Sequence, residues 1–382
     1  MLYLDAAAST APHPEVLALL HQHYQQPHAN PSSVHPWGLE QRKLLQAARM
    51  SLGQLFSLPA EGVTFVASGT ESDNLAIKGV LFRAGKPRGR FLTTHLEHKA
   101  VSEAAAWYQS IGGSVDWVEI EPATGQVDLA DLEAKLSAET TLVSIQHVNS
   151  ETGLVQDLAE IGRVIRQKAP QAVFHSDGVQ ALGKIEPNLR KWSIDLYSIS
   201  GHKVHGLLGA GALLRARNIP MEAQISGGGQ ESGLRSGTEN LPAIRALAWA
   251  AQWAESNRAA NQEAVENWAD SFFKKLSDQV SGLHFVGGAQ RVPHIRALYM
   301  DGALGEVLLH HLAAEGILAS QGSACQARSK KLSPVLRALG LNDLQIRRTL
   351  RLSFSPLELK WSPAEAAKAF ASAVQQVRQI TS

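Results

Sequence analysis

The sequence predicts an α/β protein whose mostly parallel sheet carries helices on both faces. Between about residues 60 and 215, short runs rich in valine, isoleucine, phenylalanine and threonine alternate with helical patterns. This alternation is typical of parallel sheets, because a parallel connection has to cross from one end of the sheet to the other. At 382 residues, the chain is also too long for one ordinary core, so we expect two domains.

The strands of this sheet can be placed from their β-branched and aromatic residues. A helical pattern over 71–82 follows the first strand after a Gly-Thr step. A long amphipathic helix is expected over 255–280, and it opens a smaller second domain with further strands near 294–300. The strands expected in the first domain are 63–66, 90–94, 141–145, 172–175, 196–199 and 212–214.

Composition excludes several classes of protein. Apolar residues make up 44% and charged residues 19%, which is typical of a soluble globular protein. The net charge of +1 gives no reason to expect nucleic acid or an anionic membrane as a partner. No stretch reaches the roughly 18 apolar residues of a membrane helix, and residues 1–5 do not begin a signal peptide. We therefore expect a cytoplasmic enzyme.

Three residues near the middle of the chain have the chemistry that pyridoxal 5'-phosphate (PLP) requires. Lys203 can hold the aldehyde of the cofactor covalently and later act as a base. Asp177 can keep the pyridine nitrogen protonated, and Gln180 can donate to the phenolic oxygen. Asp177 and Lys203 each lie just beyond an expected strand, where open α/β sheets bind ligands. The alternatives are a solvated lysine, and a turn or helix N-cap at Asp177.

Four further residues are suited to the phosphate group of PLP. Ser200 and His202 stand beside the lysine and can hydrogen-bond a phosphate. Gly69 and Thr70 lie between a strand and a helix, where backbone N–H groups and the helix dipole favour an anion. The alternative is a capping box over 70–73, which is compatible with phosphate binding.

A histidine is the expected neighbour of the pyridine ring. His98 can stack on the ring and relay protons. His95 and His98 could begin a metal site, but no further ligand of matching character accompanies them, so we expect no metal. A dinucleotide is not expected either, because no Gly-x-Gly-x-x-Gly opens a helix after a first strand.

The single cysteine of the chain, Cys325, stands among small residues in Gly322-Ser323-Ala324-Cys325. A lone cysteine excludes an internal disulfide and a thiolate-only metal site. Most cysteines are buried and inert, but a thiol on a loop of small residues can reach a site and act as a nucleophile once deprotonated. Arg351, flanked by apolar residues, is either paired structurally or placed to bind a substrate carboxylate.

Taken together, the chain resembles the cysteine desulfurases of the NifS/IscS type, within the class V aminotransferase branch of fold-type I PLP enzymes. The resemblance runs almost end to end. It rests on motifs at residues 3–5, 30–35, 68–74, 97–98, 149–153, 177–180, 200–203, 227–231, 235–240, 322–325 and 351–353. The chain departs from the family pattern at Ser150, where an asparagine close to the PLP ring is usual.

The resemblance implies a fold-type I architecture with a mostly parallel seven-stranded sheet in a large domain over 15–254. A small α+β domain would combine residues 1–14 with 255–382. It also implies a homodimer in which Thr238 reaches the phosphate of the partner's cofactor, while Asn30 and Arg351 hold the substrate carboxylate.

The activity implied is the conversion of L-cysteine to L-alanine, with Lys203, His98 and Cys325 as the catalytic residues. Cys325 would take the sulfur as a persulfide. It would then pass the sulfur to an acceptor protein, for iron–sulfur cluster assembly or for thio-cofactor or tRNA biosynthesis.

Other functions remain open at this point. A selenocysteine lyase or another class V enzyme would share the scaffold, although an aminotransferase has no need of the Cys325 thiol. A catalytically silent scaffold subunit is the alternative from a different class. The presence of Lys203, Asp177 and Cys325 argues against that alternative.

Overall fold

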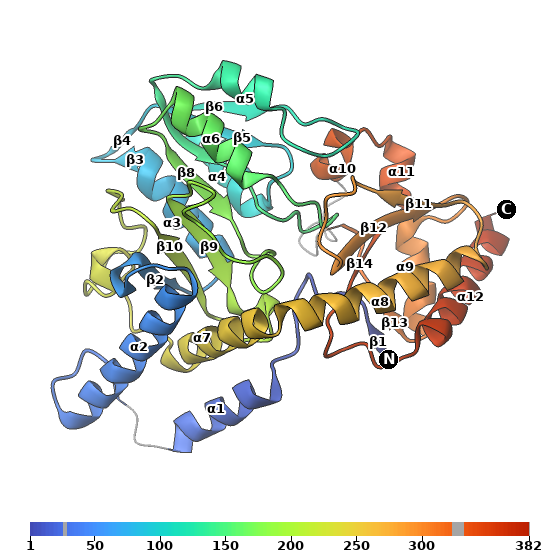
Figure 1. Cartoon of the computed structure of the whole chain (residues 1–382), viewed down its shortest axis with the longest axis horizontal. Helices are drawn as coiled ribbons and strands as arrows, with labels where there is room; N and C mark the ends of the chain where they lie inside the picture. Colours follow the sequence, from blue (N-terminus) through green and yellow to red (C-terminus); the bar gives the residue numbers. More distant parts are fainter. Residues whose placement is uncertain (26–28, 323–331, 382) are drawn as a thin grey trace.

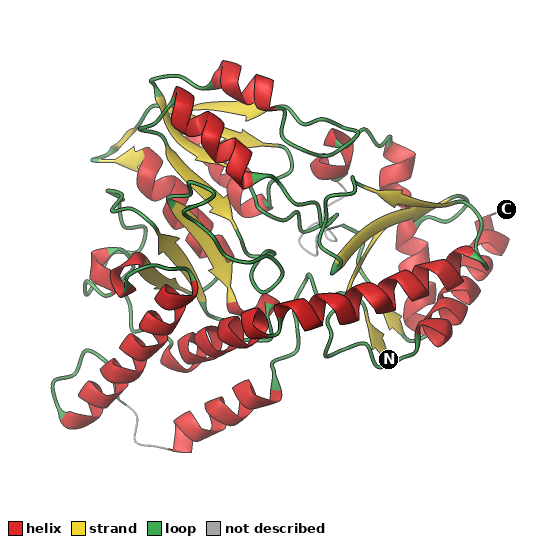
Figure 2. Ribbon diagram, in the orientation of Figure 1, coloured by secondary structure: helices red, strands yellow, loops and turns green. Residues whose placement is uncertain are grey.

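A computed structural model describes residues 1–25, 29–322 and 332–381 of the chain. Its largest element is a sheet flanked by helices (Figures 1 and 2). β10 runs antiparallel to its two neighbours, and the other neighbouring strands are parallel. The expected seven-stranded, mostly parallel sheet is thus confirmed. Its spatial order is β2 (Val63–Val66), β10 (Gly211–Arg215), β9 (Leu196–Ser200), β8 (Val173–Asp177), β7 (Thr140–Ser144), β5 (Arg90–Thr94) and β6 (Ser114–Val118).

The two faces of the sheet can be followed from residue to residue along each strand, because successive side chains of a strand point to opposite faces. Phe91 and Leu142 belong to one buried cluster, with α3 (Gly69–Leu81) and α4 (Lys99–Ser110). Their neighbours Leu92 and Val143 belong to a second cluster. That cluster includes residues of α2 (Pro36–Leu55), α5 (Leu129–Lys135), α6 (Leu158–Lys168) and α7 (Leu241–Ser256).

Local patterns predicted most of this sheet, with two errors. The edge strand β6 was not expected, and of its five residues only Val118 is buried, so the apolar signal is weak. The helix after β2 begins at Gly69 rather than Glu71. Its N-cap is Ser68, which accepts a hydrogen bond from the Glu71 N–H, so the capping box over 70–73, the alternative to phosphate binding, is not formed.

The C-terminal part of the chain forms a separate layer around its own buried cluster (Figure 1). The expected helix over 255–280 is instead the end of α7 followed by α8 (Arg258–Ser277), with Asn257 in a non-helical conformation between them. α12 (Pro363–Thr381) packs against α8 and against α9 (Gly305–Ala314), and an antiparallel sheet shares their buried cluster. The strands of that sheet are β11 (Leu283–Val286), β12 (Ile295–Met300) and β14 (Thr349–Ser353).

The N-terminal segment connects the two layers. β1 (Leu2–Tyr3) pairs with β13 (Ile317–Leu318), and the segment then crosses to the loop after β9. There the backbone N–H of Thr10 donates to the carbonyl of His202 over 2.9 Å. Residues 1–14 thus contact both layers, and their grouping with the C-terminal part stays a prediction, as do the domain boundaries.

The remaining elements are short or peripheral. In the described ranges, no helix combines the length and the apolar character that crossing a membrane requires. The elements not yet given are α1 (Pro14–Gln25), α10 (Pro334–Ala338), α11 (Asp343–Arg348), the hairpin β3 (Phe82–Arg83) and β4 (Lys86–Pro87), and the 3-10 turns Ala60–Gly62, Gly201–Lys203 and Glu231–Gly233.

Candidate active site

A cavity of about 220 Å³ lies where β2, β5, β7, β8 and β9 end. This is the edge of the sheet at which the sequence placed the ligand. The structure brings nine of the predicted site residues together around it. They are Gly69, Thr70, His98, Asp177, Gln180, Ser200, His202, Lys203 and Arg351.

Asp177 is the last residue of β8, and its carboxylate faces the cavity. The turn that follows holds it in place, because the Val179 N–H donates to Asp177 Oδ1 over 2.9 Å. This is the local turn contact expected as an alternative, and the structure shows no helix N-cap there. Gly178 is required, because a Cβ there would lie 2.0 Å from the ring of Tyr197. Burial raises the pKa of Asp177, while His98 and Lys203 lower it.

Two more buried acids stand behind Asp177. Burial and the charge of Asp177 raise the pKa of Asp73 well above its ordinary value. Burial raises the pKa of Glu97 to about 8, although Gln146 and Thr94 donate to its carboxylate. Glu97 is therefore expected to be protonated at neutral pH, whereas Asp177 is the acid whose pKa burial raises and the nearby His98 and Lys203 lower.

His98 is oriented by the helix that it begins. It is the N-cap of α4, and its Nδ1 accepts the Ala100 N–H over 3.1 Å. The neutral ring therefore carries its proton on Nε2. Side-chain ligand atoms of His98, Asp73 and Asp177 lie within 4.8 Å of one another, a spacing that also suits a metal ion. His95 is not part of this group, because it stacks on Trp117 with ring centroids 4.4 Å apart.

Lys203 ends the 3-10 turn after β9, with its amine in the wall of the cavity. Its Nζ donates to the carbonyls of Ala7 over 2.7 Å and of Ala8 over 2.8 Å. The amide of Gln180 donates to the same Ala7 carbonyl over 2.9 Å. The N-terminal segment thus positions both residues, and Gln180 retains a second N–H and an Oε1 without a partner among the described residues.

Four groups that line the cavity can donate hydrogen bonds to an anion, and we call them the anion cradle. The N–H groups of Gly69 and Thr70 open α3, so they have no partner one turn earlier. The hydroxyl of Ser200 is buried and makes no hydrogen bond with a described residue. The ring of His202 contacts the Ser9 hydroxyl through Nδ1, and burial and Lys203 lower its pKa to about 4. A neutral His202 can then donate through Nε2.

Arg351 also lines the cavity and is nearly fully buried, with 2% of its side chain exposed. Its Nη2 pairs with Asp5 Oδ1 at 2.6 Å, and its Nη1 donates to the Ser150 carbonyl at 3.0 Å. Nε has no hydrogen-bond partner in the described part of the chain. Ser150, the departure from the family pattern, therefore contacts Arg351 through its backbone and also lines the cavity.

Two of the described predicted residues do not line this cavity. Asn30 and Thr238 are exposed and lie outside it, where Asn30 Nδ2 donates to Thr238 Oγ1 over 3.4 Å. Cys325 lies outside the described residues.

The sequence analysis did not single out several residues that contribute to the site. Asp73 was assigned to helix capping, and only its burial beside Asp177 indicates another role. Asp5 was noted as part of a motif, but nothing local links it to Arg351. Ala7 and Ala8 act through backbone carbonyls, which have no signal in side-chain chemistry.

A lysine beside a phosphate-type cradle, at the carboxyl ends of a mostly parallel sheet, defines a fold-type I PLP-dependent enzyme. Residues 2–358 match the aminotransferase class-V family. The cysteine desulfurase IscS of Pseudomonas putida (strain W619) is 35% identical over 391 residues, covering 100% of this chain and 94% of the relative. The chain therefore belongs to the cysteine desulfurases of the class-V aminotransferase family, which are PLP enzymes.

Two solved structures agree with this assignment. One described as a NifS-like protein has a TM-score of 0.89 and 28% identity, covering 99% of this chain and 98% of that one. A structure of SspA in complex with cysteine has a TM-score of 0.83 and 31% identity, covering 93% of this chain and 99% of that one. The expected family and fold class are confirmed.

Proposed function

We propose that this cavity binds PLP and L-cysteine, and that the chain uses Lys203, His98 and Cys325 to transfer sulfur from L-cysteine to the Cys325 thiol. The observation that carries the proposal is the shared cavity. It places an amine, a carboxylate, an anion cradle and a buried guanidinium around about 220 Å³ of space.

The residues present fit PLP. The unpartnered Ser200 hydroxyl and the first N–H groups of α3 are matched to its phosphate. Asp177 is suited to the pyridine nitrogen, whose positive charge would offset the effect of burial on the Asp177 pKa. The second N–H of Gln180 is suited to the phenolic oxygen. When bound, PLP supplies an aldehyde for the lysine and a protonated ring that withdraws electrons from the substrate Cα.

Arg351 and Lys203 then divide the handling of the substrate. Arg351 binds the cysteine carboxylate, with Nε as the donor that has no other described partner. Lys203 takes the Cα proton, after leaving the carbonyls of Ala7 and Ala8. His98 holds its exchangeable proton at Nε2, and this nitrogen is the one that can give a proton to a group in the cavity.

The sulfur transfer is balanced without an added oxidant. The Cys325 thiolate forms an S–S bond with the substrate sulfur while the substrate Cβ–S bond breaks. The electron pair of that bond stays with the carbon fragment, which takes up protons and leaves as L-alanine. The products are L-alanine and a Cys325 persulfide, which then passes its terminal sulfur to an acceptor protein. A cytoplasmic location, where thiols stay reduced, suits this chemistry.

We propose further that the chain is a homodimer in which Asn30 and Thr238 complete the partner's site. Both residues are exposed and touch each other, and neither lines the cavity of its own chain. Large apolar side chains are also exposed on the neighbouring segment, with Val34 87% and Trp37 57% exposed. Such a patch is typical of a protein interface.

The proposal is tested by incubating the purified protein with PLP, L-cysteine and a reductant, and by measuring alanine and sulfide together. Equal amounts of both are expected. Lys203→Ala should abolish both products, while Lys191→Ala, a change at an exposed lysine outside the cavity, should retain them. Consumption of cysteine without alanine would contradict the proposal, as would full activity of Lys203→Ala.

A further inference from the structure

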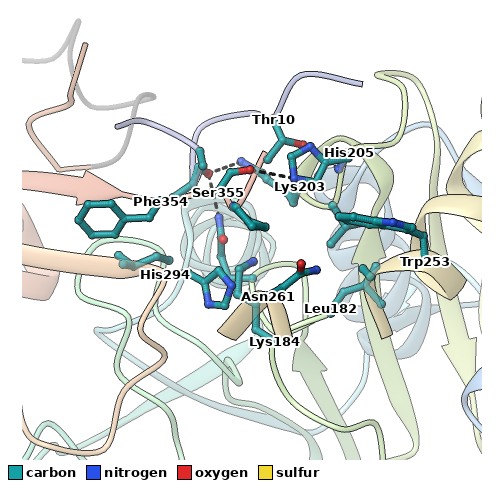
Figure 3. A pocket seen from close by; sticks show the side chains of 18 residues that line it. Thr10, Leu182, Lys184, Lys203, His205, Trp253, Asn261, His294, Phe354 and Ser355 are labelled. Atoms are coloured by element: carbon teal, nitrogen blue, oxygen red, sulfur yellow. Dashed lines mark hydrogen bonds between the residues drawn. The ribbon is translucent and has the colours of Figure 1, made fainter. Parts of the chain in front are cut away.

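A second, smaller cavity adjoins the active-site cavity (Figure 3). Ala7, Gln180 and Lys203 belong to the walls of both cavities, so the catalytic lysine separates them. Lys184 lines the second cavity and not the active-site cavity, so we call the second cavity the Lys184 chamber. Its volume is about 40 Å³. In Figure 3, the side chains of Lys184 and His294 lie close together at one end of it.

The polar part of this chamber consists of bases and neutral donors. Lys184, Lys203, His205 and His294 line it, and its described lining includes no aspartate or glutamate. Asn261 adds an amide (Figure 3). Lys203 is compensated by Asp177 in the active-site cavity, whereas Lys184 has no acid beside it in the described lining, so this chamber favours an anion over a cation.

Two of these groups have a polar atom without a hydrogen-bond or ion-pair partner among the described residues. Lys184 makes no side-chain hydrogen bond or ion pair with a described residue. His294 is 5% exposed, and its Nδ1 has no hydrogen-bond partner in the described ranges. His205, in contrast, bonds the Ala11 carbonyl and the Ser355 hydroxyl. A buried polar group without a partner is unfavourable, so the unpaired Nδ1 of His294 indicates a missing ligand. Lys184 is partly buried, and its amine is available to bind the same ligand.

We propose that the Lys184 chamber binds one small monovalent anion of the halide class, held by the Lys184 ammonium and by a ring N–H of His294. Size favours such an anion, because a water molecule needs about 10–15 Å³ of this kind of volume. The chamber thus has room for about three water molecules or one halide, whereas a hydrated oxyanion of the phosphate type would not fit.

The electrostatics of the neighbouring bases agree with this ligand. Burial and the charge of Lys203 lower the pKa of Lys184 to about 7, so an anion would favour its charged form. Burial lowers the pKa of His294 well below its ordinary value and that of His205 to about 4. Both rings are therefore neutral at pH 7. The cation that faces the anion is then Lys184, because Lys203 Nζ donates to the carbonyls of Ala7 and Ala8 and is the amine that we expect to bond PLP.

An anion in this place would affect the catalytic lysine. Lys184 and Lys203 repel each other when both are protonated, and an anion beside Lys184 would reduce that repulsion. Halide binding would thus make Lys203 a more readily protonated amine. This consequence rests on the proposed role of Lys203, whereas the anion site itself does not.

The test uses bromide and chloride with the holoenzyme. Crystals soaked in bromide should show an anomalous difference peak within hydrogen-bond distance of Lys184 Nζ. In solution, the melting temperature should be higher in chloride than in gluconate at the same ionic strength. Lys184→Met should remove both effects. Lys86→Met, which changes an exposed lysine on the β3–β4 hairpin, should retain them.

A bromide peak that persists in Lys184→Met would overturn the proposal, as would electron density for water alone in the wild-type chamber. A peak without any chloride effect on the melting temperature would indicate an adventitious ion only, and would also overturn it. If Lys184→Met does not fold, His294→Gln replaces it, with a weaker peak and a smaller chloride effect expected. An enzyme that binds bromide but releases no alanine would contradict the proposed function and leave the anion site intact.

Discussion

Arg351 and Asp5 form an ion pair of 2.6 Å between residues 346 positions apart in the sequence. The backbone brings them together, because Asp5 forms a parallel β-bridge with Ser353, two residues after Arg351. The pair fixes the guanidinium in the wall of the active-site cavity and leaves Nε unpaired among the described residues. Asp5 is therefore the positioning residue for the group that we expect to bind the substrate carboxylate.

Replacing Asp5 with asparagine should raise the KM for L-cysteine and change kcat less. The amide keeps the shape of Asp5 but removes the charge that orients Arg351. Breaking a buried ion pair from one side costs up to about 3–5 kcal/mol, and the partial exposure of Asp5 should reduce that loss of stability. Steady-state kinetics and urea unfolding check both effects. A lower KM would contradict the prediction, because it would mean that Asp5 competes with the substrate.

The sequence predicted the parts of the site that depend on local pattern. Strand-end positions located Asp177 and Lys203, and a strand–helix junction located Gly69. Contacts between distant segments were not predictable in this way. The Ala7 carbonyl that accepts from Lys203 is 196 positions away, and a backbone carbonyl has no signature in the sequence. The Lys184 chamber likewise exists only once the N-terminal segment crosses the large sheet.

The free energy of unfolding of the Glu97→Gln variant, relative to that of the wild type, should increase as the pH rises. The pKa of Glu97 is raised to about 8, so between about pH 5 and 8 the folded protein holds a proton that the unfolded chain has lost. Because of Glu97, the free energy of unfolding of the wild type falls as the pH rises through this range, by at most about 1.4 kcal/mol per pH unit. Glutamine lacks this dependence. Urea unfolding of the cofactor-free proteins at pH 6 and pH 8 measures the difference.

The opposite result has a clear meaning. Glutamine can still accept the hydrogen bonds from Thr94 and Gln146 that Glu97 Oε1 accepts. An equal loss of stability at both pH values would therefore show that the wild-type carboxylate is ionised. Thr94→Val is the matched control, because it removes one donor and leaves the carboxyl group buried.

Cys325→Ser should separate cofactor binding from sulfur transfer. No group that we assign to the PLP site is altered, so the variant should bind PLP as the wild type does. It should form no persulfide, and its yield of alanine should fall by at least tenfold, because an alcohol is a much weaker nucleophile toward sulfur than a thiolate. Mass spectrometry after a single turnover detects the extra sulfur atom. Wild-type sulfide release by the variant would show that Cys325 is structural.

The proposed sharing of Thr238 between subunits predicts complementation. Thr238→Ala and Lys203→Ala should each form inactive or weakened dimers. A mixed dimer should contain one active site in which both native residues are present, if Thr238 acts on the partner's cofactor. Activity should then recover to up to half of the wild-type value when the variants are co-expressed. A mixture without recovery would contradict the sharing, and tagged subunits purified in tandem confirm that mixed dimers were assayed.

Stability should fall in acid because of buried histidines, and His147 is the simplest to test. Burial lowers its pKa to about 3, and its Nδ1 is 2.8 Å from the Tyr197 hydroxyl. Between about pH 6.5 and 3 the unfolded chain binds a proton that the folded protein does not. The free energy of unfolding therefore rises with pH across this window, by up to about 1.4 kcal/mol per unit for this residue.

His147→Gln should remove that share of the slope, measured by urea unfolding at pH 5.0 and 6.5. Tyr197→Phe is the matched control. It removes the hydrogen-bond partner of His147 and leaves the imidazole buried, so it should lower stability at both pH values and retain the slope. If His147→Gln keeps the wild-type slope, the imidazole is protonated in the folded protein. That outcome would contradict the prediction, because burial is the cause of the lowered pKa of His147 and a protonated imidazole would mean that burial does not lower it.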